Sequence, residues 1–320
     1  MGRGTGVSSL SFLSSFSTID ALLLLMALIW GTNYAIVKST FAEIDPQAFN
    51  CLRLMLASGV FLTAMTLTRR LRVGAGIFYT RAPVTRRDAL AFAGLGLVGH
   101  TIYQYCFIAG LARTSVANSA LLIAATPIVV ALLTAAMGQE RISRLHWFGT
   151  ALSIAGIYVV VGRGARLSGD SVHGDVLVAI GVVCWAIYTV GARPLMTRHS
   201  PVGVTGLSMS LGTAFYLPLM WGHLARLSWP DVSLRTWVIL VYSTLFAICV
   251  AYTIWYAAVR EIGTARTSVY SNVTPIIAML FAVVWLGEPL SSAKLTGAAL
   301  VLLGVALTRV GRAKIAAPAE

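Results

Sequence analysis

Long apolar stretches follow one another along most of the chain, separated by short polar connections. A helix that crosses ~30 Å of hydrocarbon needs ~20 mostly apolar residues. Ten stretches qualify, near residues 20–40, 47–68, 88–110, 115–137, 144–162, 174–194, 202–222, 235–257, 264–286 and 292–310. The short alternating segments of a membrane β-barrel look different. The pattern therefore predicts an all-α integral membrane protein with ten transmembrane helices, in which the lipid bilayer is the surrounding partner.

Composition supports this prediction. Of 320 residues, 58% are hydrophobic and 11% are charged, whereas soluble domains carry ~25% charged residues. The four cysteines (Cys51, Cys106, Cys184 and Cys249) lie inside predicted helices without CxxC spacing. This placement favours small buried residues over a disulfide or a zinc site. No metal and no cofactor are expected.

Two parts of the chain repeat each other. Residues 109–156 align without a gap with residues 257–304, and 12 of the 48 positions are identical. Both copies hold a Thr-Pro-Ile block, which begins at Thr126 and at Thr274, and a later glutamate, Glu140 or Glu288. Five predicted helices per copy mean that the second copy enters the membrane from the opposite side. The sequence thus predicts two inverted five-helix repeats, residues 20–162 and 174–310, an arrangement typical of secondary transporters and also found in some channels.

The basic residues predict the orientation in the membrane. The connection from Arg69 to Arg87 carries six arginines, and positively charged loops stay in the cytoplasm. Residues 1–19 and 311–320 are then cytoplasmic tails. The same rule explains the net charge of +13 without nucleic acid as a partner.

The opening of the first repeat is similar to that of a known family. Trp30–Gly31–Thr32–Asn33–Tyr34, followed by Lys38, Pro46, Phe49 and Arg53, resembles EamA-type proteins of the drug/metabolite transporter superfamily. Each Thr-Pro block with its later Glu and Gly-spaced helix resembles them too. The resemblance implies a ten-helix carrier of the cell inner membrane, often an exporter of amino acids or other small metabolites. The second repeat departs from the pattern, because Ala186 and Ile187 follow its tryptophan.

Aromatic and amide side chains recur at helical spacing and are the candidates for a substrate site. The candidates are Trp30, Asn33, Tyr34, Tyr103, Gln104, Phe107, Asn118, Trp185, Tyr188, Tyr252, Trp255, Tyr256, Tyr270 and Asn272. Tryptophan and tyrosine also anchor helices at the membrane interface, and asparagines also join helices by hydrogen bonds. Both alternatives stay open for single members of the set.

Several other residues have two interpretations. Arg53 either snorkels to the outer interface or faces protein or water inside the membrane. His100 is expected as a satisfied packing residue rather than a proton carrier. Pro127 and Pro275 are expected in mid-helix, where each forms a hinge or a static kink.

The remaining repeated residues are expected to be structural. Glu140 and Glu288 are predicted at helix ends, where each pairs with an arginine or caps the next helix, so the whole Thr-Pro-Ile block is interpreted as scaffold. Gly149, Gly156, Gly297 and Gly304 allow close helix contact, either between the two helices that carry them or with a second subunit in a homodimer.

These features predict a secondary transporter, not an enzyme, that exports small amino-acid-like or aromatic metabolites by alternating access. No GxxxxGK[ST] phosphate loop and no HExxH motif occurs. A multidrug or cation efflux carrier and a non-transporting membrane scaffold are the alternatives. Uniport, exchange and proton antiport all remain open.

Overall fold

The computed structural model describes residues 17–80, 82–114, 119, 122–159, 169–286, 292–310 and 314–315. Asn118, Glu288 and most of both predicted tails lie outside the described residues. The regular elements of the described chain are helices, apart from two strands of two residues each, which pair antiparallel.

The elements of the first half are α2 (Thr18–Lys38), η1 (Ser39–Ala42), α3 (Pro46–Leu71), α4 (Arg86–Gly96), η2 (Leu97–Ile102), α5 (Tyr103–Arg113), α7 (Thr126–Ala136), β1 (Glu140–Arg141) and α8 (Arg144–Ile157). Those of the second half are α9 (Gly169–Leu195), α10 (Pro201–Ala225), η4 (Trp229–Asp231), α11 (Leu234–Tyr242), η5 (Ser243–Val250), α12 (Ala251–Ile262), α13 (Thr264–Val269), η6 (Tyr270–Asn272), α14 (Val273–Leu286), α15 (Ser292–Val310) and β2 (Lys314–Ile315).

Six helical segments of the described chain are long and apolar enough to cross a membrane. They are Thr18–Ala42, Pro46–Leu71, Arg86–Arg113, Val172–Leu195, Pro201–Ala225 and Leu234–Ile262. The other four predicted stretches contain shorter described helices, namely α7, α8, α13 with α14, and α15. The protein is therefore an all-helical membrane protein, as the apolar pattern predicts.

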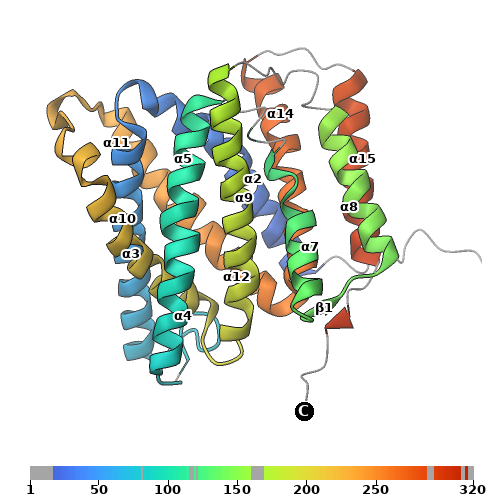
Figure 1. Ribbon diagram of the computed structural model, residues 1–320, viewed down its shortest axis with the longest axis horizontal. Coiled ribbons are helices and arrows are strands. Elements are labelled where there is room, and N and C mark those ends of the chain that lie inside the picture. The colour runs from blue at the N-terminus through green and yellow to red at the C-terminus, as the bar shows by residue number, and fades with distance from the viewer. Residues whose placement is uncertain are drawn as a thin grey trace, which may run out of the picture.

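The helices stand side by side in one bundle (Figure 1). The bundle has two ends. At the Glu140 end, the lower one in Figure 1, lie β1 and the start of α4; at the Lys38 end, the upper one, lies the start of α9. Neighbours in the bundle include α3 with α10, α5 with α9 and α8 with α15.

Side-chain caps fix where the helices begin. Ser17 is the N-cap of α2, and Asp20 reaches back to it from the third helical position. The Ser17 hydroxyl accepts the N–H of Asp20 and the Asp20 carboxylate accepts the N–H of Ser17, which together form a capping box. Thr85 and Asp88 form the same box at the start of α4.

The two Thr-Pro stretches are not continuous helices. Pro127 and Pro275 occupy the first turns of α7 and α14, so their mid-helix placement is wrong. A turn at residues 124–125 precedes α7, and the 3₁₀ segment η6 precedes α14. Proline is favoured in a first turn because its missing N–H would have no intrahelical partner there.

Glycine brings α8 and α15 into backbone contact. A Cβ on Gly149 would lie 2.6 Å from the carbonyl oxygen of Gly304, and a Cβ on Gly156 would lie 2.6 Å from that of Gly297. The two helices thus pack against each other within one chain, which is one of the two arrangements that the glycine spacing predicts.

Two π-helical segments occupy equivalent places in the two copies. The offset of 148 residues moves η2 (97–102) onto residues 245–250 of η5. In η5, the N–H of Ala251 bonds to Phe246 instead of Ala247; in η2, the N–H of Tyr103 bonds to Val98 instead of Gly99. Each π turn thus removes the ordinary α-helical donor from one carbonyl in mid-bundle, and such turns are frequent at functional sites.

Candidate functional site

A cavity of about 60 Å³ lies inside the bundle, between helices of both halves. Its lining residues are Trp30, Asn33, Tyr34, Arg53, Tyr103, Gln104, Phe107, Ile123, Thr126, Val182, Trp185, Ala247, Ile248, Tyr252, Ser271 and Thr274. The walls are thus aromatic and aliphatic, with a few amides and hydroxyls and one cation. Such a lining is typical of small-molecule sites.

Eight of the fourteen candidate residues line this cavity. They are Trp30, Asn33, Tyr34, Tyr103, Gln104, Phe107, Trp185 and Tyr252. Five others are buried elsewhere, namely Tyr188, Trp255, Tyr256, Tyr270 and Asn272. Asn118 lies outside the described residues.

Several lining residues are equivalent positions of the two copies. Trp30 and Trp185 correspond at the offset of 155, and their rings are 6.0 Å apart in an edge-to-face arrangement. Gln104 and Tyr252 correspond at the offset of 148, and the Gln104 amide donates a hydrogen bond to the Tyr252 hydroxyl at 3.2 Å. The pairs Ile123/Ser271 and Thr126/Thr274 complete the set. The cavity therefore lies where the two copies meet.

The Thr-Pro-Ile block is part of this lining. Thr126 and Thr274, its first residues, both face the cavity. The expectation that the block is only scaffold is wrong, because each helix is broken just before the block, which brings the first turns of α7 and α14 to the site. The occurrence of this threonine in both copies is the sequence feature that could have indicated its place in the lining.

Trp30 is fixed by a hydrogen bond as well as by packing. Its indole N–H donates to the carbonyl oxygen of Ala247 at 2.9 Å. That carbonyl lacks the Ala251 N–H as a donor because of the π turn in η5. The indole ring also lies 5.5 Å from that of Trp255. The distorted helix thus holds the central aromatic residue of the site in one orientation.

A second aromatic layer closes the cavity toward the Glu140 end. Tyr188 lies one turn beyond Trp185 on α9, and Trp255 and Tyr256 lie one turn beyond Tyr252 on α12, and all three are buried. Tyr188 and Tyr256 pack edge to face at 5.2 Å. These three residues form a floor under the cavity rather than its lining.

His100 belongs to the same layer. It is fully buried in η2, with its ring 4.6 Å from that of Tyr188. Neither ring nitrogen has a hydrogen-bond partner among the described residues. The packing role is confirmed, but the expectation that its hydrogen bonds are satisfied is wrong, because the imidazole packs against the rings of Tyr188 and Tyr252 and neither nitrogen is hydrogen-bonded within the described chain.

Tyr270 and Asn272 lie in η6 on either side of the lining residue Ser271, but they are not among the lining residues themselves. The Tyr270 hydroxyl donates to the carboxylate of Asp20 and so joins η6 to the start of α2. Asn272 is fully buried. Tyr270 is therefore a tie between helices, and neither residue contacts the cavity in this conformation.

Of the two interpretations of Arg53, the one in which it snorkels to the outer interface is wrong. It is 5% exposed and faces the cavity, so it does not snorkel to the interface. It lies in the second turn of α3, a helix that packs against α10 and η5. Its guanidinium carbon lies 5.8 Å from the centre of the Phe49 ring.

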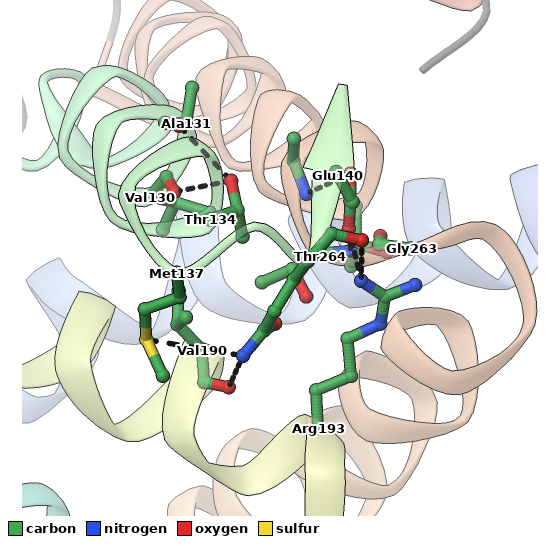
Figure 2. A network of polar contacts seen from close by, with 12 residues as sticks. Val130, Ala131, Thr134, Met137, Glu140, Val190, Arg193, Gly263 and Thr264 are labelled. Carbon is green, nitrogen blue, oxygen red and sulfur yellow. Dashed lines mark hydrogen bonds and ion pairs between the residues drawn. The ribbon is translucent and has the colours of Figure 1, made fainter. Parts of the chain in front are cut away.

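Glu140 ties elements of both halves together at one end of the bundle (Figure 2). Its carboxylate accepts a hydrogen bond of 2.6 Å from the N–H of Thr264 and forms an ion pair of 3.0 Å with the guanidinium of Arg193. Gly263, with φ of 90°, makes room, since a Cβ there would lie 2.9 Å from the carboxylate. Glu140 thus pairs with an arginine as predicted, but it caps α13 and not the next helix, which Ser143 caps.

The described residues contain no group of three or more His, Cys, Asp or Glu side chains that could hold a metal ion. The four cysteines are buried and unpaired with one another. The arrangement offers a shaped, mostly apolar compartment with hydrogen-bonding groups, which suits binding of a small amphipathic molecule.

Several known proteins that resemble this chain are described as transporters. An uncharacterized transporter of Bacillus subtilis, YyaM, is 26% identical over 306 residues, which cover 93% of this chain and 95% of the relative. A probable terminal-alkyne amino-acid exporter of Streptantibioticus cattleyicolor is 28% identical over 221 residues, covering 69% of this chain and 73% of that protein. A crystal structure with a TM-score of 0.73 and 21% identity, covering 93% of this chain and 99% of that one, shares the fold.

The family comparison covers nearly the whole described chain. The model of the EamA-like transporter family matches residues 17–162 and 172–310. These two stretches contain the Trp30 and Trp185 faces and both Thr-Pro blocks. The resemblance that the opening motif indicates is confirmed, and the chain is a transporter that belongs to the EamA-like transporter family.

Proposed function

We propose that the protein is a secondary transporter that exports small amphipathic metabolites of the amino-acid class by alternating access. The observation that carries this proposal is the position of the cavity, where equivalent residues of the two copies meet. Transporters built from inverted repeats place their substrate site at the repeat interface near the middle of the membrane.

The inverted relation of the two copies is part of the proposal. Its support is reciprocal contact: Gly149 packs on Gly304 and Gly156 packs on Gly297, while Gly149/Gly297 and Gly156/Gly304 are equivalent positions of the repeat. The first glycine of each copy therefore contacts the second glycine of the other copy, which is the contact pattern that a two-fold axis produces. The π turns at equivalent positions in η2 and η5 support the same relation.

Within this proposal the structure is a state closed toward the Glu140 end. The floor of Tyr188, Trp255 and Tyr256 and the Glu140–Arg193 ion pair both lie on that side of the cavity. A volume of about 60 Å³ is below the ~300 Å³ of small ligand pockets. Substrate binding therefore needs movement of the aromatic side chains, which rocking of one half against the other would supply.

The substrate class follows from the walls and from one relative. Indole and phenol rings attract apolar and aromatic groups, and Asn33 and Gln104 offer hydrogen bonds. The relative in S. cattleyicolor is described as an amino-acid exporter. An amphipathic amino acid or its derivative fits both observations.

We further propose that the Glu140 end faces the cytoplasm of the cell that makes the protein, with both termini on that side of the inner membrane. The arginine-rich connection between α3 and α4 supports this orientation. A homodimer remains a proposal as well. Reporter fusions at the two termini and at residues 226–233 test the orientation, and light scattering of the purified protein tests the dimer.

Transport itself is tested in proteoliposomes. Vesicles that contain the purified protein are preloaded with unlabelled amino acid and given the labelled one outside, with and without a pH gradient. Counterflow without a gradient indicates exchange or uniport, and uptake that needs the gradient indicates proton antiport. If no amino acid moves under either condition, the proposed substrate class is wrong.

The alternatives make different predictions. A multidrug or cation carrier raises resistance to lipophilic cations when it is expressed and needs an essential acidic residue at the site. Among the described lining residues none is acidic. A non-transporting scaffold has no need of the cavity, so replacement of Trp30 and Trp185 by alanine would leave its activity unchanged.

A further inference from the structure

We propose that Arg53 binds the carboxylate of the transported molecule, so that the cavity selects carboxylates and rejects amines that lack one. This inference deepens the proposed transport function and rests on it. It concerns one residue, which is the only cation among the described lining residues of the cavity.

The first observation is the burial of an unneutralised charge. Arg53 is 5% exposed, and its Nε–H has no hydrogen-bond partner among the described residues. A guanidinium group stays protonated in proteins, and a buried ion without a partner costs several kcal/mol. A cation kept at that cost in the interior of a membrane bundle is typical of a binding site.

The second observation is that the carboxylates whose partners the structure gives are bound to groups other than Arg53. Asp45 pairs with His223, Asp88 with Arg198 and His199, and Glu140 with Arg193. Glu43 accepts hydrogen bonds from Ser233 and Thr236, and Asp20 accepts one from Tyr270. No described carboxylate forms an ion pair with Arg53, so the partner of its charge comes from outside the described chain.

The third observation is how the guanidinium is held. Phe49, one turn earlier on α3 and fully buried, packs within 5.8 Å of the guanidinium carbon. A guanidinium stacked on a ring keeps its N–H edge available, and that edge matches the two oxygens of a carboxylate. The arginine is thus supported by an apolar surface, and its donors are left for a ligand.

The rest of the lining completes an amphipathic site. Tyr252 accepts the hydrogen bond of Gln104, which leaves the tyrosine hydroxyl able to donate to a ligand oxygen. Trp30 and Trp185 form the apolar wall. A molecule with a carboxylate at one end and an apolar or aromatic body at the other matches the whole lining.

Three probes that share one phenyl group test the inference: phenylalanine, 3-phenylpropionate and phenethylamine. Only the last lacks a carboxylate. Binding to the full-length protein in detergent is followed by calorimetry, and counterflow in proteoliposomes is followed in parallel. We expect both carboxylates to bind the wild type at least about tenfold more tightly than phenethylamine, because only they can accept charge-assisted hydrogen bonds from the guanidinium.

Arg53→Gln should remove that preference, weakening both carboxylates by about tenfold or more while phenethylamine binds no worse. Arg53→Lys keeps the charge but loses the paired donors, so intermediate affinity is expected. Arg70→Gln removes an exposed arginine of the same helix and should change none of the three affinities. Because Arg53→Gln removes a buried unpaired charge, its melting temperature without ligand should equal or exceed that of the wild type; a fall would indicate a structural role and overturn the proposal.

The outcomes separate this inference from the proposed function. If phenethylamine binds and moves as well as the carboxylates, transport stands and the role of Arg53 is wrong. If carboxylates bind in an Arg53-dependent manner but do not cross the membrane, the site stands and the transport proposal is wrong. If neither carboxylate binds at millimolar concentration, the role of Arg53 is overturned whatever else the vesicles take up.

Discussion

The carboxylate of Glu140 lies 3.0 Å from the guanidinium of Arg193 and at the same time accepts the backbone N–H of Thr264. Glu140 follows α7 in the first half, whereas Arg193 and Thr264 belong to α9 and α13 of the second half. One buried side chain therefore joins three helices across the two halves at one end of the bundle.

Glu140→Gln should destabilise this end strongly. A glutamine keeps an acceptor for Thr264 but leaves Arg193 without its counter-charge, and breaking a buried ion pair costs about 3 kcal/mol or more. The free energy of unfolding in a denaturing-detergent titration measures the effect. A double-mutant cycle with Arg193→Gln should show clear coupling between the two residues.

Arg198→Gln is the matched control. Arg198 pairs with Asp88 at the same end, but its side chain is 49% exposed, so its loss should cost less than about 1 kcal/mol. Equal losses for Glu140→Gln and Arg198→Gln would show that burial does not strengthen the Glu140 pair.

Gly149→Val should separate α8 from α15. A Cβ at Gly149 would lie 2.6 Å from the Gly304 carbonyl oxygen, and overpacking costs about 1–3 kcal/mol. Gly59→Ala serves as the comparison, because a Cβ there meets nothing within 4 Å and alanine favours the helix by ~0.5–1 kcal/mol. Melting temperatures that fall together in the two variants would contradict the close contact.

Trp30→Phe and Trp30→Ala should affect transport to different degrees. Phenylalanine keeps an aromatic wall and loses only the hydrogen bond to Ala247, about 1 kcal/mol, whereas alanine removes the wall itself, about 3–5 kcal/mol. Counterflow of phenylalanine should therefore fall slightly in the first variant and severely in the second. Trp221→Ala removes an exposed indole and should leave counterflow intact; a similar loss there would point to general damage.

The connection after α2 should loosen in acid. Hydrogen bonds from the Ser233 and Thr236 side chains lower the pKa of Glu43 below its ordinary value of 4.5. A carboxyl group whose pKa is lower in the folded state stabilises the fold above its unfolded pKa, and this contribution is lost as the pH falls through the folded value. Hydrogen exchange at Ser233, corrected for intrinsic rates, should rise in that window in the wild type. In Glu43→Gln it should be raised at every pH, and an unchanged profile would contradict the tie.

The spacing of apolar and aromatic residues along the sequence predicted the helical fold and part of the cavity lining. Trp30 and Trp185 lie well inside their predicted helices, 20–40 and 174–194, which argues against interfacial anchoring, and both line the cavity. Tyr188 and Tyr256 share the same helix faces as lining residues but lie one turn lower. A helix wheel gives the direction of a side chain and not its depth, so it could not separate lining from floor.

Other misses came from packing between distant elements. The position of Arg53 near a helix start suggests an easy path to the interface, whereas the folded bundle, in which α3 packs against α10 and η5, buries its side chain. The helix breaks before Pro127 and Pro275 leave proline in a first turn, which its chemistry allows equally well as a kink. The partner of Glu140 depends on where α9 ends and α13 begins, and no local pattern contains that information.

The hydrogen bond from Trp30 to Ala247 has a mirror image that this conformation does not use. The equivalents of these residues in the other copy are Trp185 and Gly99, and the carbonyl of Gly99 likewise lacks its α-helical donor because of the π turn in η2. If the two halves exchange conformations, as we propose, the indole N–H of Trp185 should donate to the carbonyl oxygen of Gly99. The hydrogen bond from the indole N–H of Trp30 to Ala247 should break in the same step. Each of the two tryptophans would then form its hydrogen bond in only one of the two conformations. The ¹⁵N chemical shifts of their indole N–H groups would report toward which side of the membrane the transporter is open.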